Sequence, residues 1–519
     1  MNGNFNEYKY NNCSARGVCS TNPKTTSLQR VIFRYIKHLA YYALKLKDSE
    51  KETENIKKLI LFSVSILASN IEFSETDFYS LKNSFEKTTD AAITKYKAVC
   101  KQQGCKADIL KPFIRSKKND DIISFIKLGE KEFSKSGKNF PAEKLNLYEI
   151  LFLIIKSLCI NIISAFSYNI NTDEYYETLL LTLNSLIEFN AGVDDIKLQI
   201  FDIANSDYEL MKKIRAAQED YYGEQTAAEV SYTTKSGKAV LVVGSDISEL
   251  EKILKALKEY DIYTHDEMLI AHTFPRLKEY SNLKGQYGMG YENCLLDFST
   301  FPGPIILTRN SLYNVENLYR GRLFSTDFVH SRGVIRIQNN DYSEVIQSAE
   351  ASKGFKTGKI CDSELIGFNY NEVLNQLNQH FENDAYTGVV ILGNPEGDNY
   401  MTEYYRTLTE HIPENFFVIS MYCCKAKDNL FSINAPYDNY ALSYIAEKAA
   451  GKKTVSVFMP LCKRHTVTDL IYLSENKNIN IFWNTKCCTF INPAVIKSVC
   501  ELSGIHIIST PKQDIEKLI

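Results

Sequence analysis

The sequence predicts a multidomain α and α/β protein, with an N-terminal helical region followed by two Rossmann-like α/β domains. Up to about residue 225, apolar residues recur at three- and four-residue spacing, which is typical of amphipathic helices, and Pro and Gly are sparse. From about residue 236, short β-rich runs alternate with helical stretches, the pattern of parallel sheets. The length of 519 residues fits two to four domains of roughly 100–200 residues each.

The helical region begins with a stretch that Ser27 is expected to cap, because apolar residues between Val31 and Ala43 share one helical face. The same periodicity recurs at 51–70, 75–103, 145–168, 174–189 and 207–219. We therefore expect helical bundles, two of them stacked, over residues 1–225. The most apolar stretch, 145–166, is interrupted by Lys156, Ser157 and Asn161, so it predicts a buried helix and not a membrane span.

Seven β-rich runs follow, and they are Lys238–Val243, Pro304–Leu307, Val389–Leu392, Phe416–Met421, Thr454–Phe458, Ile479–Trp483 and His506–Ile508. Ser248 is expected to cap the first helix of this part, which runs to about Tyr260. A boundary near residue 366 gives two α/β domains, 226–366 and 367–519. Ligands of such sheets bind at the carboxyl ends of the strands. The residues expected there are Ser245, Ser311, Asn394, Cys423, 461–463 and Asn484.

Composition narrows the classes of function. The formal net charge of −3 is close to neutral, which argues against a nucleic-acid partner. The first residues lack the basic start and apolar run of a signal peptide. Thirteen cysteines scattered through the chain favour free thiols or metal ligands over disulfides. We expect a cytoplasmic protein that binds neither nucleic acid nor a membrane.

Two stretches carry a resemblance to a known family. Cys13 and Cys19 stand in Cys-Ser-Ala-Arg-Gly-Val-Cys, and residues 263–275 read Tyr-Thr-His-Asp-Glu-Met-Leu-Ile-Ala-His-Thr-Phe-Pro. Further phrases follow in order through 238–327, among them Phe-Pro-Gly-Pro-Ile-Ile-Leu-Thr-Arg-Asn-Ser-Leu at 301–312. Together they resemble the hybrid-cluster (prismane) protein family, the hydroxylamine reductases, and more distantly the nickel carbon-monoxide dehydrogenases. The resemblance implies a prismane-like fold.

The resemblance also implies a cubane iron–sulfur cluster near the N-terminus, held in the family by four cysteines. Cys13 and Cys19 match the last two of them, but residues 1–12 contain no cysteine that could supply the others. Such a cluster needs about four firmly held ligands. Two interpretations stay open: ordinary thiols in an inherited loop, or a partial cluster that other residues or a partner chain complete.

The family's second, catalytic cluster is held by a histidine, two glutamates and four cysteines. Glu267 and Cys423 match one glutamate and one cysteine. The other five positions hold, or fall near, Ser245, Ser311, Asn394, Pro436 and Lys463. A serine hydroxyl is a poor replacement for thiolate because its proton is far harder to remove, and a lysine ammonium repels a cationic cluster.

Two classes of function follow. In the first, the chain binds no cofactor and is a pseudoenzyme without hydroxylamine reductase activity, acting as a binding or partner subunit that contacts another protein chain. In the alternative, it is a redox iron–sulfur enzyme, an oxidoreductase of the hydroxylamine reductase type, with an altered cluster on Cys13, Cys19, Glu267 and Cys423. Whether the chain is an enzyme stays open at this point. His265 and His272, which flank Glu267, are expected to form structural hydrogen bonds.

Overall fold

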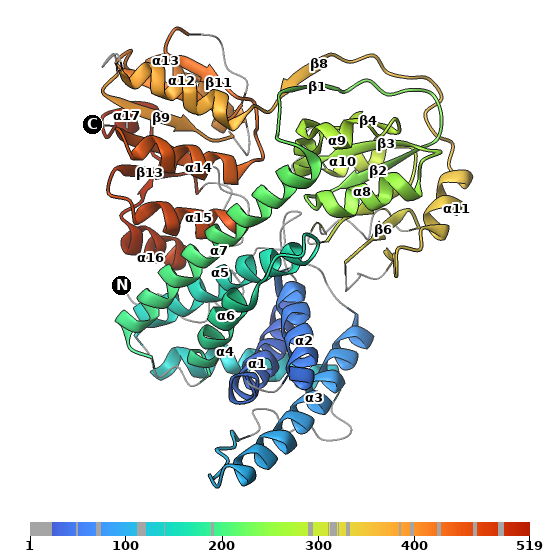
Figure 1. The fold of residues 1–519 in the computed structure, drawn as a ribbon, viewed down its shortest axis with the longest axis vertical. Helices are drawn as coiled ribbons and strands as arrows, with labels where there is room; N and C mark the ends of the chain where they lie inside the picture. Colours follow the sequence, from blue (N-terminus) through green and yellow to red (C-terminus); the bar gives the residue numbers. More distant parts are fainter. Residues whose placement is uncertain are drawn as a thin grey trace.

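The computed structural model describes residues 23–47, 50–68, 74–111, 121–139, 141–187, 191–288, 294–309, 311, 319, 321–327, 333–382, 386–394, 399–422, 427–459, 464–485 and 493–518. Helices come first along the chain, and two parallel sheets covered by helices follow (Figure 1). The predicted fold class is therefore confirmed. The domain limits at residues 225/226 and 366/367 stay predictions.

Seven helices build the first part of the chain, and they are α1 (Pro23–Lys45), α2 (Glu50–Ala68), α3 (Glu75–Gln102), α4 (Ile122–Asn139), α5 (Ala142–Phe166), α6 (Asp173–Ser185) and α7 (Val193–Tyr222). Helix α4 was not predicted, and α7 extends well beyond the predicted 207–219. In Figure 1, α7 rises from the helical region toward the junction of the two α/β regions.

The predicted cap at Ser27 is wrong. Helix α1 begins at Pro23, and Ser27 lies buried within it. Proline is favoured in the first turn because it has no N–H that would need an intrahelical partner. A Cβ on Gly129 of α4 would lie 2.1 Å from the carbonyl oxygen of Ser27, so the two helix backbones touch there. Ser27 is a packing residue, and the contact requires glycine on α4.

Helix α5 is the central helix of this part. By length and composition it is the one described helix apolar enough to cross a membrane, but 67% of its apolar window is buried inside the protein. It packs against α2 and α7 and against two helices of the last α/β region, α15 (Arg464–Ser474) and α16 (Pro493–Ser503). A helix that is apolar on all sides belongs in a core. This burial is what the sequence predicted for 145–166.

The first large sheet has the order β4-β3-β2-β5-β6-β7, and all its pairs are parallel. Its strands are β2 (Ala239–Val243), β3 (Asp261–His265), β4 (Leu283–Gln286), β5 (Ile305–Leu307), β6 (Leu323–Ser325) and β7 (Ile335–Arg336). The helices around it are α8 (Ile247–Ala256), the 3-10 helix η2 (Asp266–Thr273), α9 (Pro275–Lys278), α10 (Cys294–Thr300) and α11 (Ser343–Ala351).

Helix α8 is capped by Asp246 and not by Ser248, so the prediction of that cap is also wrong. The Asp246 carboxylate accepts hydrogen bonds from the backbone N–H groups of Ser248 and Glu249 at 3.1 and 3.2 Å. Aspartate is a strong N-cap because its carboxylate satisfies the free N–H groups of the first turn and carries a charge that the helix dipole favours.

The second large sheet has the order β11-β10-β9-β12-β13-β14, again all parallel. Its strands are β9 (Gly388–Leu392), β10 (Phe416–Ser420), β11 (Leu430–Ser432), β12 (Thr454–Met459), β13 (Ile479–Trp483) and β14 (His506–Ile507). Besides α15 and α16, its helices are α12 (Tyr370–Glu382), α13 (Asn399–His411), α14 (Asn439–Ala450) and α17 (Pro511–Ile515). All seven predicted β-rich runs form strands of the two sheets.

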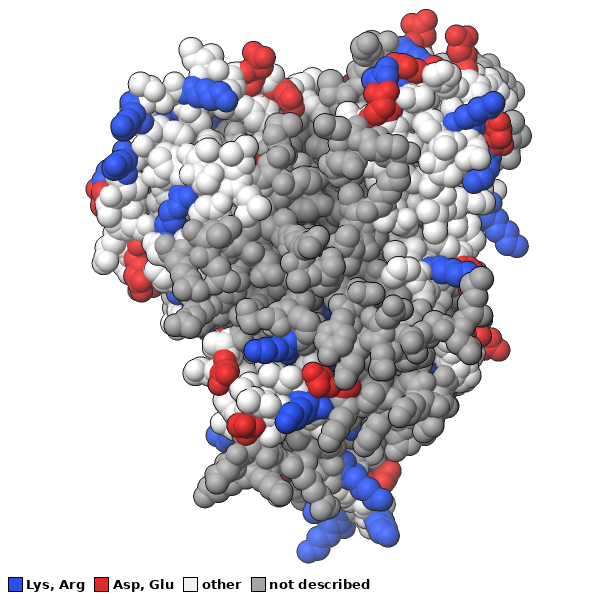
Figure 2. All heavy atoms as spheres, turned by 180° about the vertical axis from the view of Figure 1, so that it is seen from behind, with Lys and Arg blue, Asp and Glu red and all other residues white. Residues whose placement is uncertain are grey.

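A two-stranded antiparallel ribbon connects the parts. Strand β1 (Ala228–Ser231) follows α7, and it pairs with β8 (Ser363–Ile366), which precedes the second sheet. The pairing was not predicted, because the two strands lie far apart in the chain. Seen from behind, acidic and basic side chains are interspersed over the described surface (Figure 2).

A buried ion pair fixes α7 to the last α/β region. Arg215 of α7 donates two hydrogen bonds to the carboxylate of Asp438, at 2.9 and 3.0 Å, and its guanidinium stands 5.2 Å from the ring centroid of Tyr440. The side chain of Asp438 is 3% exposed and also caps α14 by accepting from the N–H of Ala441. Two-point pairing of this kind fixes geometry as well as charge.

We expect Arg215→Met to lower the free energy of unfolding by about 3–5 kcal/mol, because Asp438 is left buried without its cation. Urea and thermal denaturation measure the effect. Lys212→Met is the matched control on the same helix, since its 3.5 Å pair with Glu209 is exposed and such pairs contribute less than about 1 kcal/mol. Equal effects of the two substitutions would contradict the assignment.

Candidate functional site

The carboxyl ends of parallel strands bring the predicted site positions to the edges of the two sheets. Ser245 follows β2, Glu267 follows β3 and Ser311 follows β5, which are adjacent strands of the first sheet. Asn394 follows β9 and Pro436 follows β11 in the second sheet. The remaining predicted residues, Cys13, Cys19, Cys423 and Lys463, lie outside the described residues.

Ser311 packs inside its own loop. Its side chain is buried, and its Oγ lies 3.3 Å from the Oγ1 of Thr308, which donates a hydrogen bond to the carbonyl of Val243 at 2.9 Å. Gly244 has a φ of +123°, and a Cβ there would lie 2.0 Å from the Oγ of Ser311. The glycine therefore permits the β2 and β5 ends to touch. Ser245, next to it, is solvent-exposed.

A buried ion cluster occupies the point where the strand order of the first sheet reverses, between β2 and β5. Arg309 donates to Asp246 at 3.2 Å and to Glu249 at 3.0 Å, and the backbone N–H of Arg309 donates to Glu249 at 3.0 Å. Burial opposes the charge of Arg309, but the two carboxylates outweigh it and raise the pKa of the guanidinium. Ligands of doubly wound sheets bind at this crevice, and here Arg309 and the two carboxylates pair with one another.

The two histidines around Glu267 form internal hydrogen bonds. His265 is fully buried, with its Nε2 3.0 Å from the Oδ2 of Asp297, and His272 has its Nε2 2.8 Å from the hydroxyl of Thr264. Glu267 lies between them in η2 and is partly buried. Burial lowers the pKa of His272 to about 4. The structure thus supports the predicted structural role of both histidines.

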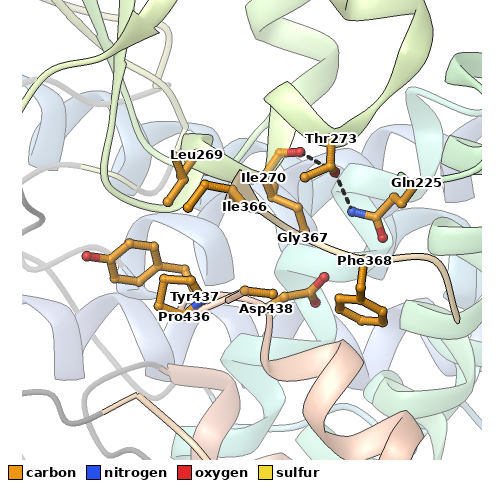
Figure 3. Close-up of a pocket in the computed structure, with 11 residues that line it drawn as sticks. Gln225, Leu269, Ile270, Thr273, Ile366, Gly367, Phe368, Pro436, Tyr437 and Asp438 are labelled. Atoms are coloured by element: carbon orange, nitrogen blue, oxygen red, sulfur yellow. Dashed lines mark hydrogen bonds between the residues drawn. The ribbon is translucent and has the colours of Figure 1, made fainter. Parts of the chain in front are cut away.

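A small pocket lies on the seam between the two α/β regions (Figure 3). Three segments far apart in the chain form its walls, 269–273 of η2, 366–368 after β8, and 435–438 before α14. Leu269 and Ile366 belong to a buried apolar cluster with Val230, and Tyr437 packs against that cluster. Pro436, which matches a cluster cysteine in the resemblance above, lines the same pocket.

The polar groups of this pocket are engaged with the protein itself. Gln225 donates to the hydroxyl of Thr273 at 2.8 Å, and that hydroxyl donates to the carbonyl of Ile270 at 2.7 Å, as the dashed lines of Figure 3 show. Asp438 is paired with Arg215. The pocket therefore offers apolar walls and few free donors or acceptors, which suits packing better than acid–base chemistry.

The donor atoms that the structure describes at these edges do not by themselves fit an iron–sulfur–oxygen cluster. Among the described positions of the resemblance, the sheet edges hold two serine hydroxyls, the amide of Asn394, the ring of Pro436 and the one carboxylate of Glu267. Cluster iron needs thiolates, with imidazole and carboxylate at its labile sites. Within the described ranges, moreover, no three His, Cys, Asp or Glu side chains gather as metal ligands would.

The sequence analysis missed three of the residues that shape this region. Arg309 comes soon after a predicted strand, so a charged residue at a strand end was an available signal. Arg215 and Asp438 gave no such signal, because 223 positions separate them.

Comparison with known proteins finds a family to which most of the chain matches. A sequence profile described as "Prismane/CO dehydrogenase family" matches residues 9–441. A hydroxylamine reductase of Thermodesulfovibrio yellowstonii is 25% identical over 542 residues, covering 99% of each chain. One of Syntrophobacter fumaroxidans is 26% identical, covering 98% of this chain and 97% of the relative. Carbon monoxide dehydrogenase IV from Carboxydothermus hydrogenoformans aligns in structure over 98% of this chain and 88% of that one, with 10% identity and a TM-score of 0.48.

The buried His272 predicts a dependence of stability on pH. Its pKa of about 4 in the folded protein lies below the roughly 6.5 of an unfolded chain, so only the unfolded state takes up a proton between these values. Stability is full above about pH 6.5 and falls as the pH drops, by about 3 kcal/mol at most.

We expect His272→Gln, which cannot take up this proton, to reduce the loss of stability between pH 7 and pH 5 in urea denaturation. His411→Gln serves as the control, because the imidazole of His411 is exposed at the end of α13. If both variants lose stability with acid as steeply as the wild type, His272 does not carry the effect.

Proposed function

The chain belongs to the Prismane/CO dehydrogenase family, and from this premise we propose that it is a member that assembles no hybrid cluster. On this proposal it has no hydroxylamine reductase activity and acts as a binding or partner subunit. The observation that carries the proposal is the burial of Ser311 against Gly244 and Thr308, where the resemblance places a cluster thiolate.

The chemistry of the replacements supports the loss of the cluster. A hydroxyl keeps its proton at any pH near neutrality, so Ser311 and Ser245 supply no anionic soft donor. The amide of Asn394 and the ring of Pro436 supply none either. Removing most ligands of a cluster removes most of its affinity, because each ligand is held in place by the others.

The packing of the seam gives a second line of support. Leu269, Ile366 and Tyr437 bring apolar side chains together where Pro436 and η2 meet. At the crevice of the first sheet, Arg309 is paired with the carboxylates of Asp246 and Glu249. At these described positions, side chains of the protein contact one another.

A role as a binding or partner subunit agrees with a folded scaffold whose ligand positions are mostly changed. The chain forms two parallel sheets and a helical region, whereas five of the seven ligand positions that the resemblance implies hold other residues. Fold and activity are separable, since function depends on the site and not on the scaffold. On this proposal the partner is another protein chain, and neither nucleic acid nor a membrane is involved.

The alternative is a redox iron–sulfur enzyme of the hydroxylamine reductase type. The relatives named hydroxylamine reductase favour this alternative. Its ligands would be Cys13, Cys19, Glu267 and Cys423, of which the structure describes Glu267. On this alternative Glu267 would be a hard oxygen ligand and the cysteines would supply thiolates.

Anaerobic purification followed by iron and acid-labile sulfide analysis tests the proposal. We expect iron well below one atom per chain, no brown colour and no paramagnetic resonance signal at low temperature, because too few soft donors converge. A sample treated with ferrous iron and sulfide under reducing conditions controls for loss of a cluster during purification. Several irons per chain with matching sulfide would establish the alternative.

We also expect Cys423→Ser to leave iron content, hydroxylamine turnover and thermal midpoint as in the wild type. Glu267→Gln is the companion variant, since Glu267 is the described residue of the same predicted ligand set. The Thermodesulfovibrio yellowstonii relative, assayed in parallel for hydroxylamine reduction, shows that the assay works. A loss of iron or turnover in either variant would contradict the proposal.

A further inference from the structure

Two free cysteines meet at the C-terminal end of α3. Cys100 lies in the last turn of the helix and is 3% exposed, whereas Cys105 follows the helix and is exposed to solvent. Neither cysteine falls on a ligand position that the resemblance implies. What this pair does is therefore independent of whether the chain holds a cluster.

The backbone at the end of α3 holds the two cysteines side by side. The N–H of Cys105 donates to the carbonyl of Cys100 at 2.9 Å, and the N–H of Gly104 donates to the carbonyl of Lys101 at 3.4 Å. Gly104 has a φ of +67°, which glycine adopts at little cost. These features define the Schellman motif, in which the side chains of the first and last residues commonly contact each other. Here those two residues are Cys100 and Cys105.

The two thiols are close enough to interact. The thiol of Cys100 hydrogen-bonds that of Cys105, and this contact is the largest cause of the raised pKa of Cys105. A disulfide requires Cα atoms roughly 4.4–6.8 Å apart, which suits two residues joined by a backbone hydrogen bond. A metal site would need about four ligands, and among the described residues no third His, Cys, Asp or Glu gathers with this pair. A covalent link between the two sulfurs is the chemistry that the geometry favours.

A link here would constrain the segment that follows α3. Residues 105–110 contact α1, where the hydroxyl of Tyr41 lies 3.0 Å from both the carbonyl oxygen and the carboxylate of Asp108. Ala107 and Leu110, both partly buried, pack against the core. A disulfide would tie the start of this segment to α3, whereas Tyr41 already ties its middle to α1. Local opening of the segment would then cost more free energy.

We propose that Cys100 and Cys105 form a reversible disulfide, a thiol-modification site that responds to small-molecule disulfides of the glutathione class. The link restrains residues 104–110 when it is formed and releases them when it is reduced. Because Cys105 is exposed, the link belongs to the kind of disulfide that reducing agents open readily.

The exchange balances without any bound cofactor. The thiolate of the exposed Cys105 attacks one sulfur of oxidised glutathione, which forms a mixed disulfide and releases one glutathione thiolate. Cys100 then loses its proton and its sulfur attacks the sulfur of Cys105, which forms the link and releases the second glutathione. Two electrons and two protons pass from the protein to two glutathione thiols. Because the pKa of Cys105 is raised, the reaction accelerates as the pH rises above neutrality.

Peptide mapping detects the link directly. The folded full-length protein is incubated with oxidised glutathione, blocked with iodoacetamide and digested with trypsin. Trypsin cleaves after Lys101, between the two cysteines, so the link appears as peptide 98–101 joined to peptide 102–106. We expect this joined pair, its disappearance after excess dithiothreitol, and slower amide hydrogen exchange over residues 104–110 in the oxidised protein.

Single substitutions assign the order of attack. Cys100→Ser should leave Cys105 as a lasting mixed disulfide with glutathione, because the second thiol is missing. Cys105→Ser should leave Cys100 unmodified, because that thiol is buried. Cys361→Ser changes a partly exposed cysteine far along the chain, and this matched control should form the joined peptides as the wild type does. Should Cys100→Ser fail to fold, the wild-type map and the variant at the exposed Cys105 still decide.

Wild-type protein in which Cys105 carries glutathione or stays unmodified, without linking to Cys100, would overturn the proposal. Protein unfolded in urea tests the role of the helix end, because even a flexible chain closes so short a loop at a modest entropic cost. We expect the folded protein to be half linked at a severalfold lower ratio of oxidised to reduced glutathione than the unfolded protein. Equal ratios in the two states would show that the fold does not favour the link and would overturn the proposal as well.

Discussion

The buried pair of Arg215 and Asp438 is the interaction on which the arrangement of the α/β regions depends. Asp438 accepts two hydrogen bonds from α7 and caps α14 at the same time. The turn at 435–438 is thereby held against the helical region, and Pro436 and Tyr437 face η2 across the seam. Because both charges are desolvated, neither can be lost without leaving the other unpaired, so the geometry of the seam is tightly constrained.

At the strand ends, the backbone sets the position of each residue and the side chain sets its chemistry. Parallel sheets bring Ser245, Glu267 and Ser311 to one edge whatever their side chains are, because the backbone ladder sets the position of each strand end. The close approach of Gly244 to Ser311 and the ion cluster of Arg309 both lie at that edge.

Buried charge is treated in two ways in this protein. At Arg215 and Arg309, carboxylates are matched by guanidinium groups with two or more hydrogen bonds. At Asp207, the hydroxyl of Ser157 and the amide of Asn161 donate hydrogen bonds to the buried carboxylate.

The sequence by itself determined the class of fold, most of the helices and seven strands, because these follow from the local periodicity of apolar residues. The sequence motifs at 13–19, 263–275 and 301–312 also indicated the family, and the predicted strands placed Ser245 and Ser311 at strand ends. The sequence did not determine that Ser27 packs against Gly129, that Asp246 caps α8, or that β1 pairs with β8. Nor did it show that Arg215 meets Asp438 or that Ser157 and Asn161 donate to Asp207. Only the tertiary structure decided these features, because they depend on contacts between residues far apart in the chain, and local propensity carries no information about such partners.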